Sequence, residues 1–565
     1  MKRNNSNNNN KSGKGRSNCG NKRHDDVKRE QPRKDSSDKR INYDNARESK
    51  IEADMKKDNA NDISWYSKSP ILMQSAGSIP FSSILGRDRS LEIPGILSIP
   101  WAPAFGSSDI ALNQCANSTY SFLVHANSRN YNYNAPDLGM LIFGGMQPFC
   151  MLASIIRAYG TAKAYTEENM YFPDRLLAAQ GFQADDVRAN LPDMWYSINN
   201  FIDQLKQIWI PNVYPILDRW MWLNSEMFTD AEGLRSQTYI YVQSQYLIYD
   251  EMSLSTGGCL RPLTTNGEPS TSSWFNPAVQ RYTWAVWKKA MQDLIDALVS
   301  SEDRGIIYGD ILNAYGADKI RAFAPIESNF TVIPRYNAEA LMQIENTYTS
   351  PISPLGLTQA DNQLYPMYSD AFNNKYGGGN PNAASFLYNQ VALNYHNVTQ
   401  PSPEIVTIMT RNINMGVRIE TGYKASISSK KLTVAKSTIV RPDACGSEIF
   451  GIPTIWTVNS NLTLSNKFGE VLVKQYFQGL NVGGGFEEWS EHHLRMVMNM
   501  SSFDWHPAII MGMTEGTIDT TAKTVTFTSD PAIEGAFLDF DNYSIVGTEV
   551  IKRLHDMAMF SLLGV

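Results

Sequence analysis

The feature that most constrains the fold is an uncharged apolar run that extends from Leu138 to Ile156. A run of this length has to leave water, either inside a bilayer or inside a large protein core. Gly139, Gly145 and Pro148 interrupt the run. Such breaks favour two buried helices in a large core over a membrane span. The run therefore predicts a core with room for two apolar helices, and we expect no stable membrane insertion.

Further helices are predicted on both sides of this run. Pro192 and Asp193 precede an amphipathic helix that Pro211 should stop. Its apolar stripe consists of Met194, Ile198, Phe201, Leu205 and Ile208. Asn276 and Pro277 form a cap and first turn for a second helix that should reach about Ser300. Helical patterns dominate as far as about residue 316.

The later part of the chain has a mixed pattern. The stretches "NFTVIPRY" (329–336) and "EALMQIENTYT" (339–349) are interpreted as strands, and residues 416–530 alternate with period two in several places. Ser402-Pro403-Glu404 predicts one more helix, and an apolar stripe from Val550 to Phe560 predicts a C-terminal helix. The fold class expected from these patterns is α+β, with a predominantly helical part followed by a smaller strand-containing part.

The N-terminal stretch cannot contribute to a core. Residues 1–60 hold 17 Lys and Arg and 10 Asp and Glu, a balance of +7; because the whole chain carries −7, the remainder carries −14. The first 24 residues contain no acid and almost no apolar residue. We expect this arm to be disordered when free, and a basic arm on an acidic body suggests a polyanion such as nucleic acid. The cations of this first stretch are Lys2, Arg3, Lys11, Lys14, Arg16, Lys22 and Arg23.

The composition changes along the chain predict four regions. Residues 1–62 form the basic arm, and residues 63–330 a mainly helical domain. That domain begins with an extended segment (65–110) that wraps over a neighbour or over its own core, since its prolines disfavour a helix or a central strand. Residues 331–530 form a mixed α/β region, and residues 531–565 a C-terminal helix that returns to the helical domain.

The sequence contains no recognisable catalytic or metal-binding constellation. The five cysteines are scattered without a CxxC pair, and no secretory signal opens the chain, so we expect a reduced, intracellular protein without structural zinc or another cofactor. The stretch "SGKGRS" lacks the spacing of a phosphate-binding loop. Two Asn-Ala bonds, after Asn45 and after Asn59, are candidate self-cleavage sites, although chance dipeptides in an Asn-rich tract explain them more simply.

Three stretches resemble the capsid proteins of picobirnaviruses, which are small non-enveloped viruses with double-stranded RNA. They lie mostly within residues 120–230 and 400–412, and the later half resembles the family less. The stretches are "HANSRNYNYNAPDLGMLIFGGMQPFCMLASIIRAYG", "YFPDRLLAAQGFQADDVRANLPDMWYSINNFI" and "PSPEIVTIMTRN".

The resemblance implies a viral structural protein and no enzyme, apart from a single-turnover release of an N-terminal peptide. It implies homodimers that assemble into a T=1 icosahedral shell with a helical shell domain and a smaller protruding domain. The basic arm would contact the RNA genome inside, next to the viral polymerase. The protein would be found in the virion, assembled in the host cytoplasm. Two alternatives remain open at this point: a non-assembling RNA-binding protein with a basic tail, and a hydrolase with a disordered N-terminus.

Overall fold

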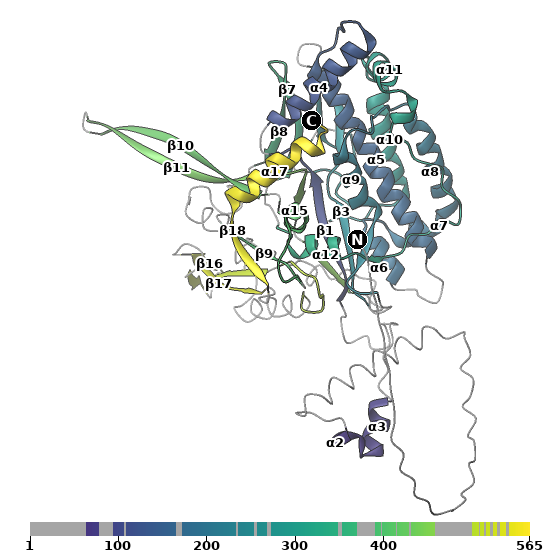
Figure 1. Ribbon diagram of the computed structural model, residues 1–565, viewed down its shortest axis with the longest axis vertical. Coiled ribbons are helices and arrows are strands. Elements are labelled where there is room, and N and C mark those ends of the chain that lie inside the picture. Colours follow the sequence, from purple (N-terminus) through teal and green to yellow (C-terminus); the bar gives the residue numbers. More distant parts are fainter. Residues whose placement is uncertain are drawn as a thin grey trace, which may run out of the picture. The chain divides into compact units, whose positions relative to one another are not determined.

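The computed structural model places most of the chain after residue 93 (Figure 1). The chain divides into two units, residues 1–81 and residues 82–565. In the first unit, two short helices are described, α2 (Ser64–Ser67) and α3 (Pro70–Gly77). The residues that the structure describes are 64–77, 94–106, 109–164, 172–232, 236–253, 257–267, 270, 273–348, 353–369, 390–396, 398–413, 415–428, 431–451, 453–457, 500–507, 509–513, 516–519, 524–527, 532–537 and 542–565.

The centre of the second unit is helix α5 (Ala135–Ala164), in which every residue from Leu138 to Thr161 is buried. The prediction of two helices here is wrong, because the helix continues through Pro148. Its glycines allow close packing: a Cβ on Gly145 would lie 2.7 Å from Ile210 Cδ1. The helix is long and apolar enough to cross a membrane, yet its apolar window is buried entirely inside the protein. The apolar run is thus a core helix.

Other helices pack around α5 (Figure 1). The predicted helix after Pro192 is confirmed as α8 (Leu191–Leu205), with the stripe from Met194 to Leu205 buried, although it ends before Pro211. The helix predicted from Asn276 begins later, as α10 (Trp284–Val299). The remaining helices of this part are α4 (Ile110–Asn127), α6 (Phe172–Ala179), α7 (Ala184–Ala189), α9 (Pro215–Ser225) and α11 (Arg304–Tyr315), with a 3-10 turn η1 (Ala317–Lys319).

A mixed sheet of six strands crosses the same unit. Its order is β12-β1-β3-β2-β6, with β13 also paired to β1. The strands are β1 (Pro94–Pro103), β2 (Met227–Thr229), β3 (Thr238–Gln243), β6 (Arg335–Tyr336), β12 (Glu448–Phe450) and β13 (Thr454–Thr457). Strands β1 and β3 are parallel, whereas β12 and β13 run antiparallel to β1. Strands β2 and β3 lie in a part of the sequence where only helices were expected.

Strand β1 corrects the expectation that its prolines exclude a central strand. It is paired on both edges, with β3 on one side and with β13 and then β12 on the other. Pro100 lies between the β13 pairing, which ends at Ser98, and the β12 pairing, which begins at Trp101. Its carbonyl accepts a hydrogen bond from Gly451 N. The missing N–H of this proline therefore falls at a gap between two partner strands.

The second sheet has four antiparallel strands in the order β4-β5-β7-β8. They are β4 (Leu247–Ser253), β5 (Gly257–Pro262), β7 (Ser353–Ala360) and β8 (Gln363–Ser369). In the sequence between β6 and β7, residues that were predicted as a strand form helix α12 (Ala338–Glu345) instead. The side chain of Asn337 caps this helix. Its residues from Ala340 to Glu345 are all buried, so the apolar pattern of this stretch did not distinguish a buried helix from a strand.

The C-terminal part contains short helices and isolated strand pairs. The predicted helix after Ser402 is confirmed as α15 (Pro403–Met409), with Ser402 as its cap, and the C-terminal helix as α17 (Thr548–Leu562). A 3-10 turn η2 (Thr410–Asn412) follows α15. The strand pairs are β9 (Gln390–Asn394) with β18 (Tyr543–Gly547), β10 (Met415–Ser428) with β11 (Lys431–Ala444), β14 (Ile509–Met513) with β17 (Ala532–Phe537), and β15 (Gly516–Asp519) with β16 (Thr524–Phe527). The α+β class with a predominance of helices is confirmed.

Candidate assembly surfaces

The residues predicted to bind RNA or to be cleaved lie outside the described part of the chain. They stay predictions from sequence. These residues are Lys2, Arg3, Lys11, Lys14, Arg16, Lys22, Arg23, Asn45 and Asn59.

The thiols of the described residues are placed for packing. Cys115, Cys150, Cys259 and Cys445 are buried and unbonded to one another. Burial raises the pKa of the Cys115 thiol to about 12 and that of Cys259 to about 11. A thiol is nucleophilic only as the thiolate, so these groups stay protonated and unreactive at neutral pH. In the described ranges, no group of three His, Cys, Asp or Glu residues is arranged to hold a metal ion.

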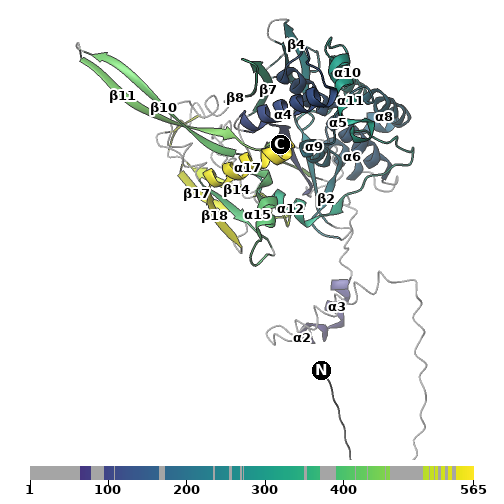
Figure 2. The same cartoon turned by 45° about the horizontal axis from the view of Figure 1, so that its top comes forward.

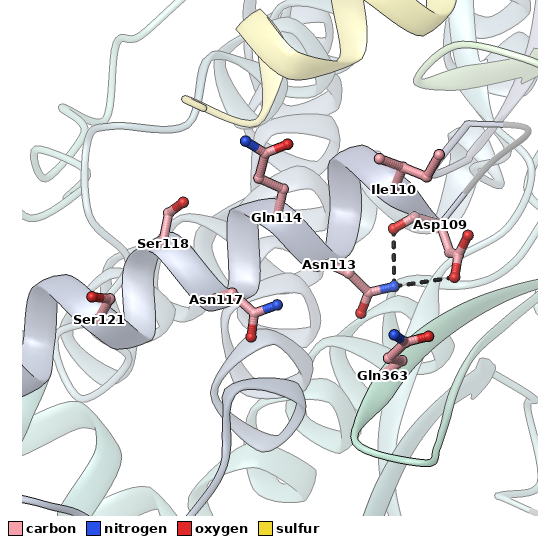
Figure 3. Close-up of a pocket in the computed structure, with 8 residues that line it drawn as sticks. All are labelled: Asp109, Ile110, Asn113, Gln114, Asn117, Ser118, Ser121 and Gln363. Atoms are coloured by element: carbon pink, nitrogen blue, oxygen red, sulfur yellow. Dashed lines mark hydrogen bonds between the residues drawn. The ribbon is translucent and has the colours of Figure 1, made fainter.

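An open groove of about 690 Å³ runs along the outer face of α4 (Figure 3). Asn113 lines the groove and donates hydrogen bonds to the backbone oxygen of Asp109 at 2.9 Å and to its carboxylate at 3.3 Å. Of the lining residues, only Asp109 is charged, so the groove offers nothing to attract a phosphate. The lining residues are Asp109, Ile110, Asn113, Gln114, Asn117, Ser118, Ser121 and Gln363.

Helix α4 as a whole is unusual for a surface helix because it contains no Lys, Arg, Asp or Glu between Ile110 and Asn127. Ile110 is 63% exposed and Phe122 is 45% exposed on it. Lys, Glu and Asp are depleted at the centres of protein interfaces, while aromatic residues are enriched there. The face of α4 therefore suits contact with protein better than contact with nucleic acid.

Arg219 on α9 joins the two chain segments that flank the β10–β11 pair. Its Nε donates to Glu448 Oε1 at 2.8 Å, after β11, and its Nη2 donates to Asn412 Oδ1 at 3.3 Å, before β10. A third bond, from Nη1, reaches Gln343 Oε1 at 3.1 Å. Glu448 is 1% exposed and also accepts a hydrogen bond from Ser447 Oγ. Because a buried carboxylate is costly without a partner, this arginine fixes both flanks of the hairpin in place.

Helix α17 contacts both α9, which carries Arg219, and strand β10 of the hairpin. His555 lies on the buried side of this helix, and its Nε2 donates a hydrogen bond to the carbonyl of Thr410 at 2.9 Å. Burial lowers the pKa of His555 well below its usual value, and the nearby Arg411 and Arg219 lower it further. Burial likewise lowers the pKa of Arg411 to about 10. His555 is therefore neutral at physiological pH and acts as a hydrogen-bond donor that seats α17.

The exposed side of α17 and the neighbouring strand β18 carry apolar residues, although Glu549 and Arg553 are exposed on the same helix. Val550 and Met557 on the helix are 53% and 64% exposed, and Ile545 on β18 is 62% exposed. Strand β18 pairs only with β9, so one of its edges is free among the described strands. Exposed apolar residues next to an open strand edge are typical of surfaces that another chain covers. Sequence reasoning predicted the helix but not this surface, because exposure depends on the packing of residues distant in sequence.

Comparison with known proteins gives matches over most of the chain. A family model described as "Picobirnavirus, Capsid protein" matches residues 65–477. A "Capsid protein precursor" from Human picobirnavirus (strain Human/Thailand/Hy005102/-) is 22% identical over 545 residues, which is 89% of this chain and 91% of the relative. A solved structure, "X-ray crystallographic structure of the picobirnavirus capsid", is similar with a TM-score of 0.63 and 20% identity, over 89% of this chain and 98% of that chain.

Proposed function

We propose, from the premise that this chain belongs to the picobirnavirus capsid protein family, that its subunits pair as dimers and close into a T=1 icosahedral shell around double-stranded RNA. A capsid protein is a structural component of the virion. Assembly in the host cytoplasm and enclosure of the viral polymerase together with the RNA are part of the same proposal.

The division of charge along the chain is the observation that carries the RNA contact. Residues 1–60 hold a balance of +7, against −14 for the rest. Cations that neutralise phosphates release condensed counterions, so the contact would be independent of RNA sequence and sensitive to salt. The described α4 groove, with Asp109 as its single charged lining residue, offers no alternative phosphate site. The arm is therefore the part of the chain best suited to RNA.

The RNA contact is tested by replacing the seven cations from Lys2 to Arg23 with Gln. We expect particles with less RNA and a salt dependence of RNA binding weakened by about 0.9 in the log–log slope for each lost phosphate contact. The matched control replaces the Asn run 7–10 with Ser, which keeps every charge. Unchanged RNA content in the first variant, measured by the ratio of absorbance at 260 and 280 nm, would refute this role of the arm.

Assembly is tested by expressing the full chain and examining it by negative-stain microscopy and sedimentation. Uniform closed particles are expected. A chain that stays a monomer or dimer under all salt and pH conditions would contradict the shell and would favour a non-assembling RNA-binding protein. A hydrolase is disfavoured by the family and by the buried thiols of the described residues. Turnover of a small substrate that is abolished by one carboxylate or His substitution would reverse that preference.

Self-cleavage in the arm is tested by the intact mass of the particle subunit. Cleavage after Asn45 or after Asn59 predicts two distinct masses, and Asn→Ala at the site used should restore the full mass. A wild-type subunit of full mass in mature particles would show that neither bond is cut.

A further inference from the structure

Four asparagines among the described residues precede a glycine or a serine. They are Asn117, Asn127, Asn224 and Asn266. The side chain of an asparagine can be attacked by the backbone nitrogen of the next residue, and a small next residue obstructs that approach least. The reaction requires a backbone that can bring this nitrogen onto the side-chain carbon Cγ. The setting of each bond in the fold therefore decides which of the four can react.

Two of these asparagines lie inside helices. Asn117 and Ser118 are in the middle of α4, where backbone nitrogens donate to the carbonyls of the preceding turn. Asn224 lies in α9 and is fully buried, and its Nδ2 donates a hydrogen bond to Gln243 Oε1 at 2.7 Å. A helical backbone keeps the next nitrogen engaged and at a fixed distance from Cγ, so neither bond has the freedom to react.

Asn127, at the end of α4, is held in another way. The nitrogen of the next residue, Ser128, donates to the carbonyl of Val124 as the cap of the helix. The Asn127 side chain is fixed as well, because its Nδ2 donates to Tyr131 Oη at 2.7 Å and to the carbonyl of Asp310 at 3.0 Å. Both reacting groups of this bond are therefore occupied in the folded protein.

Asn266 lies in a different setting, beyond the end of β5. It belongs to a loop whose ends are joined by a hydrogen bond from Phe275 N to the carbonyl of Leu263 at 2.7 Å. Strand β4, which pairs with β5, packs beside α10 (Figure 2). Asn266 and Gly267 are both exposed and lie in no helix or strand. The body thus fixes the base of this loop, whereas its Asn-Gly bond lies in water.

Gly267 has the backbone that the reaction favours. Its φ of +81° lies in the left-handed region, and a Cβ built on it would meet nothing within 4 Å. Its carbonyl accepts a hydrogen bond from Arg261 Nη2 at 3.2 Å, on the side of the residue away from Asn266. Among the hydrogen bonds of the described residues, the nitrogen of Gly267 donates none. The attacking atom is therefore not engaged, unlike the corresponding nitrogen after Asn127.

We propose that Asn266 is a self-modification site of the folded protein. The nitrogen of Gly267 attacks Asn266 Cγ, so that an N–Cγ bond forms and the Cγ–Nδ2 bond breaks. Ammonia leaves with the proton that the Gly267 nitrogen gives up. One water molecule then opens the resulting succinimide ring at either carbonyl, which yields aspartate or isoaspartate. Each event adds one negative charge to a body that already carries −14 beyond residue 60, and so increases the repulsion between copies.

The test incubates the purified full-length protein in neutral buffer and follows each asparagine by trypsin digestion and mass spectrometry. The tryptic peptide 236–281 contains only Asn266 and Asn276, and Asn276 precedes Pro277, whose nitrogen carries no hydrogen. Conversion in this peptide therefore reports on Asn266. We expect it to be at least about tenfold faster than conversion at the other three asparagines, because the orientation of the attacking atom governs the rate. Methylation by protein isoaspartyl methyltransferase should identify the isoaspartate.

Two variants test the proposed route. Gly267→Ala adds a Cβ beside the attacking nitrogen and should slow conversion at Asn266 by about fivefold or more. The matched control is Gly309→Ala, which adds a Cβ in α11 that meets nothing within 4 Å and should leave the rate unchanged. Asn266→Gln leaves the backbone of the loop unaltered and should abolish the isoaspartate in peptide 236–281. Equal conversion at all four asparagines, no conversion at Asn266 in the folded protein, or isoaspartate that persists in Asn266→Gln would each overturn the proposal.

Discussion

Helix α5 and the β10–β11 hairpin are both rich in apolar residues, but they differ in how many sides they have to bury. Every residue of α5 from Leu138 to Thr161 is enclosed by its own chain. The register of the hairpin places alternate residues on two faces, one mostly apolar and one mostly polar, and its last residue, Ala444, is buried beside Ala104 and Ile449. The difference shows that apolar residues stabilise a core where several elements enclose them, as they enclose α5, whereas a two-stranded hairpin by itself offers only one partner strand.

The largest effect is expected from truncating a core residue of α5, with a truncation in the hairpin as the comparison. Phe149 on α5 is fully buried and stacks on Phe323 with ring centres 5.8 Å apart. Phe149→Ala should cost about 3–5 kcal/mol in the free energy of unfolding. Val434→Ala on the hairpin, which pairs with no third strand among the described strands, should change the stability of the subunit by less than about 1 kcal/mol. Urea midpoints followed by tryptophan fluorescence test both, and equal losses of subunit stability would break the comparison.

A slightly smaller loss is expected where the hairpin is anchored to the core. Arg219→Met leaves Glu448 buried without its cation, which should cost about 3 kcal/mol or more. Arg335→Met is the matched control: Arg335 is 58% exposed and pairs with Glu226 at 3.0 Å, so its loss should cost less than about 1 kcal/mol. Hydrogen exchange should accelerate in residues 410–413 and 446–450 only in the first variant. Equal thermal shifts in the two variants would show that Arg219 does not anchor the hairpin.

Two helical glycines, Gly160 on α5 and Gly309 on α11, test how closely α5 packs against its neighbours. A Cβ on Gly160 would lie 2.8 Å from the backbone nitrogen of Val332, whereas a Cβ on Gly309 of α11 would meet nothing within 4 Å. Gly160→Ala should therefore destabilise the subunit by about 2 kcal/mol through overpacking. Gly309→Ala should stabilise it by roughly 0.5–1 kcal/mol through helix propensity. Thermal unfolding measures both, and shifts of the same sign would contradict the tight docking of α5.

A further effect concerns the pH dependence of the α17 contact beside the hairpin. The pKa of His555 is lowered well below 6.5 in the folded chain, so on acidification the unfolded state takes up the proton first. Stability therefore falls as the pH drops below about 6.5, by about 1.4 kcal/mol between pH 7.5 and 5.5. His555→Gln keeps a hydrogen-bond donor and should lose this part of the dependence.

The measurement for His555 is the difference in urea stability between wild type and variant at the two pH values. The difference isolates His555 from other groups, such as Asp174 and Asp230, whose pKa burial raises. Because these carboxyls bind protons more tightly when folded, they oppose the effect of His555 on acidification. Identical pH profiles in wild type and variant would show that His555 does not seat α17.

Local sequence patterns predicted part of the fold. The helical period of Met194, Ile198 and Phe201 is sufficient for α8, and the cap at Ser402 is sufficient for α15, because both signals lie within one element. The same reasoning failed for α12 and for the continuity of α5 through Pro148. In both elements the surrounding core, and not the local propensity, determines the conformation. The candidate site was predicted less well, since the period-two pattern of residues 416–530 indicated strands without indicating their partners.

The amino-acid sequence by itself determined which segments have to be buried and where charge accumulates. The uncharged run from Leu138 to Ile156 requires a core, and the balance of +7 in residues 1–60 is a property of composition alone. Only the tertiary structure decided the pairing of Ile96 with Trp456 across the six-stranded sheet and the register of the hairpin. The physical reason is that strand pairing joins residues distant in the chain, and a period of two specifies the faces of a strand but not its neighbour.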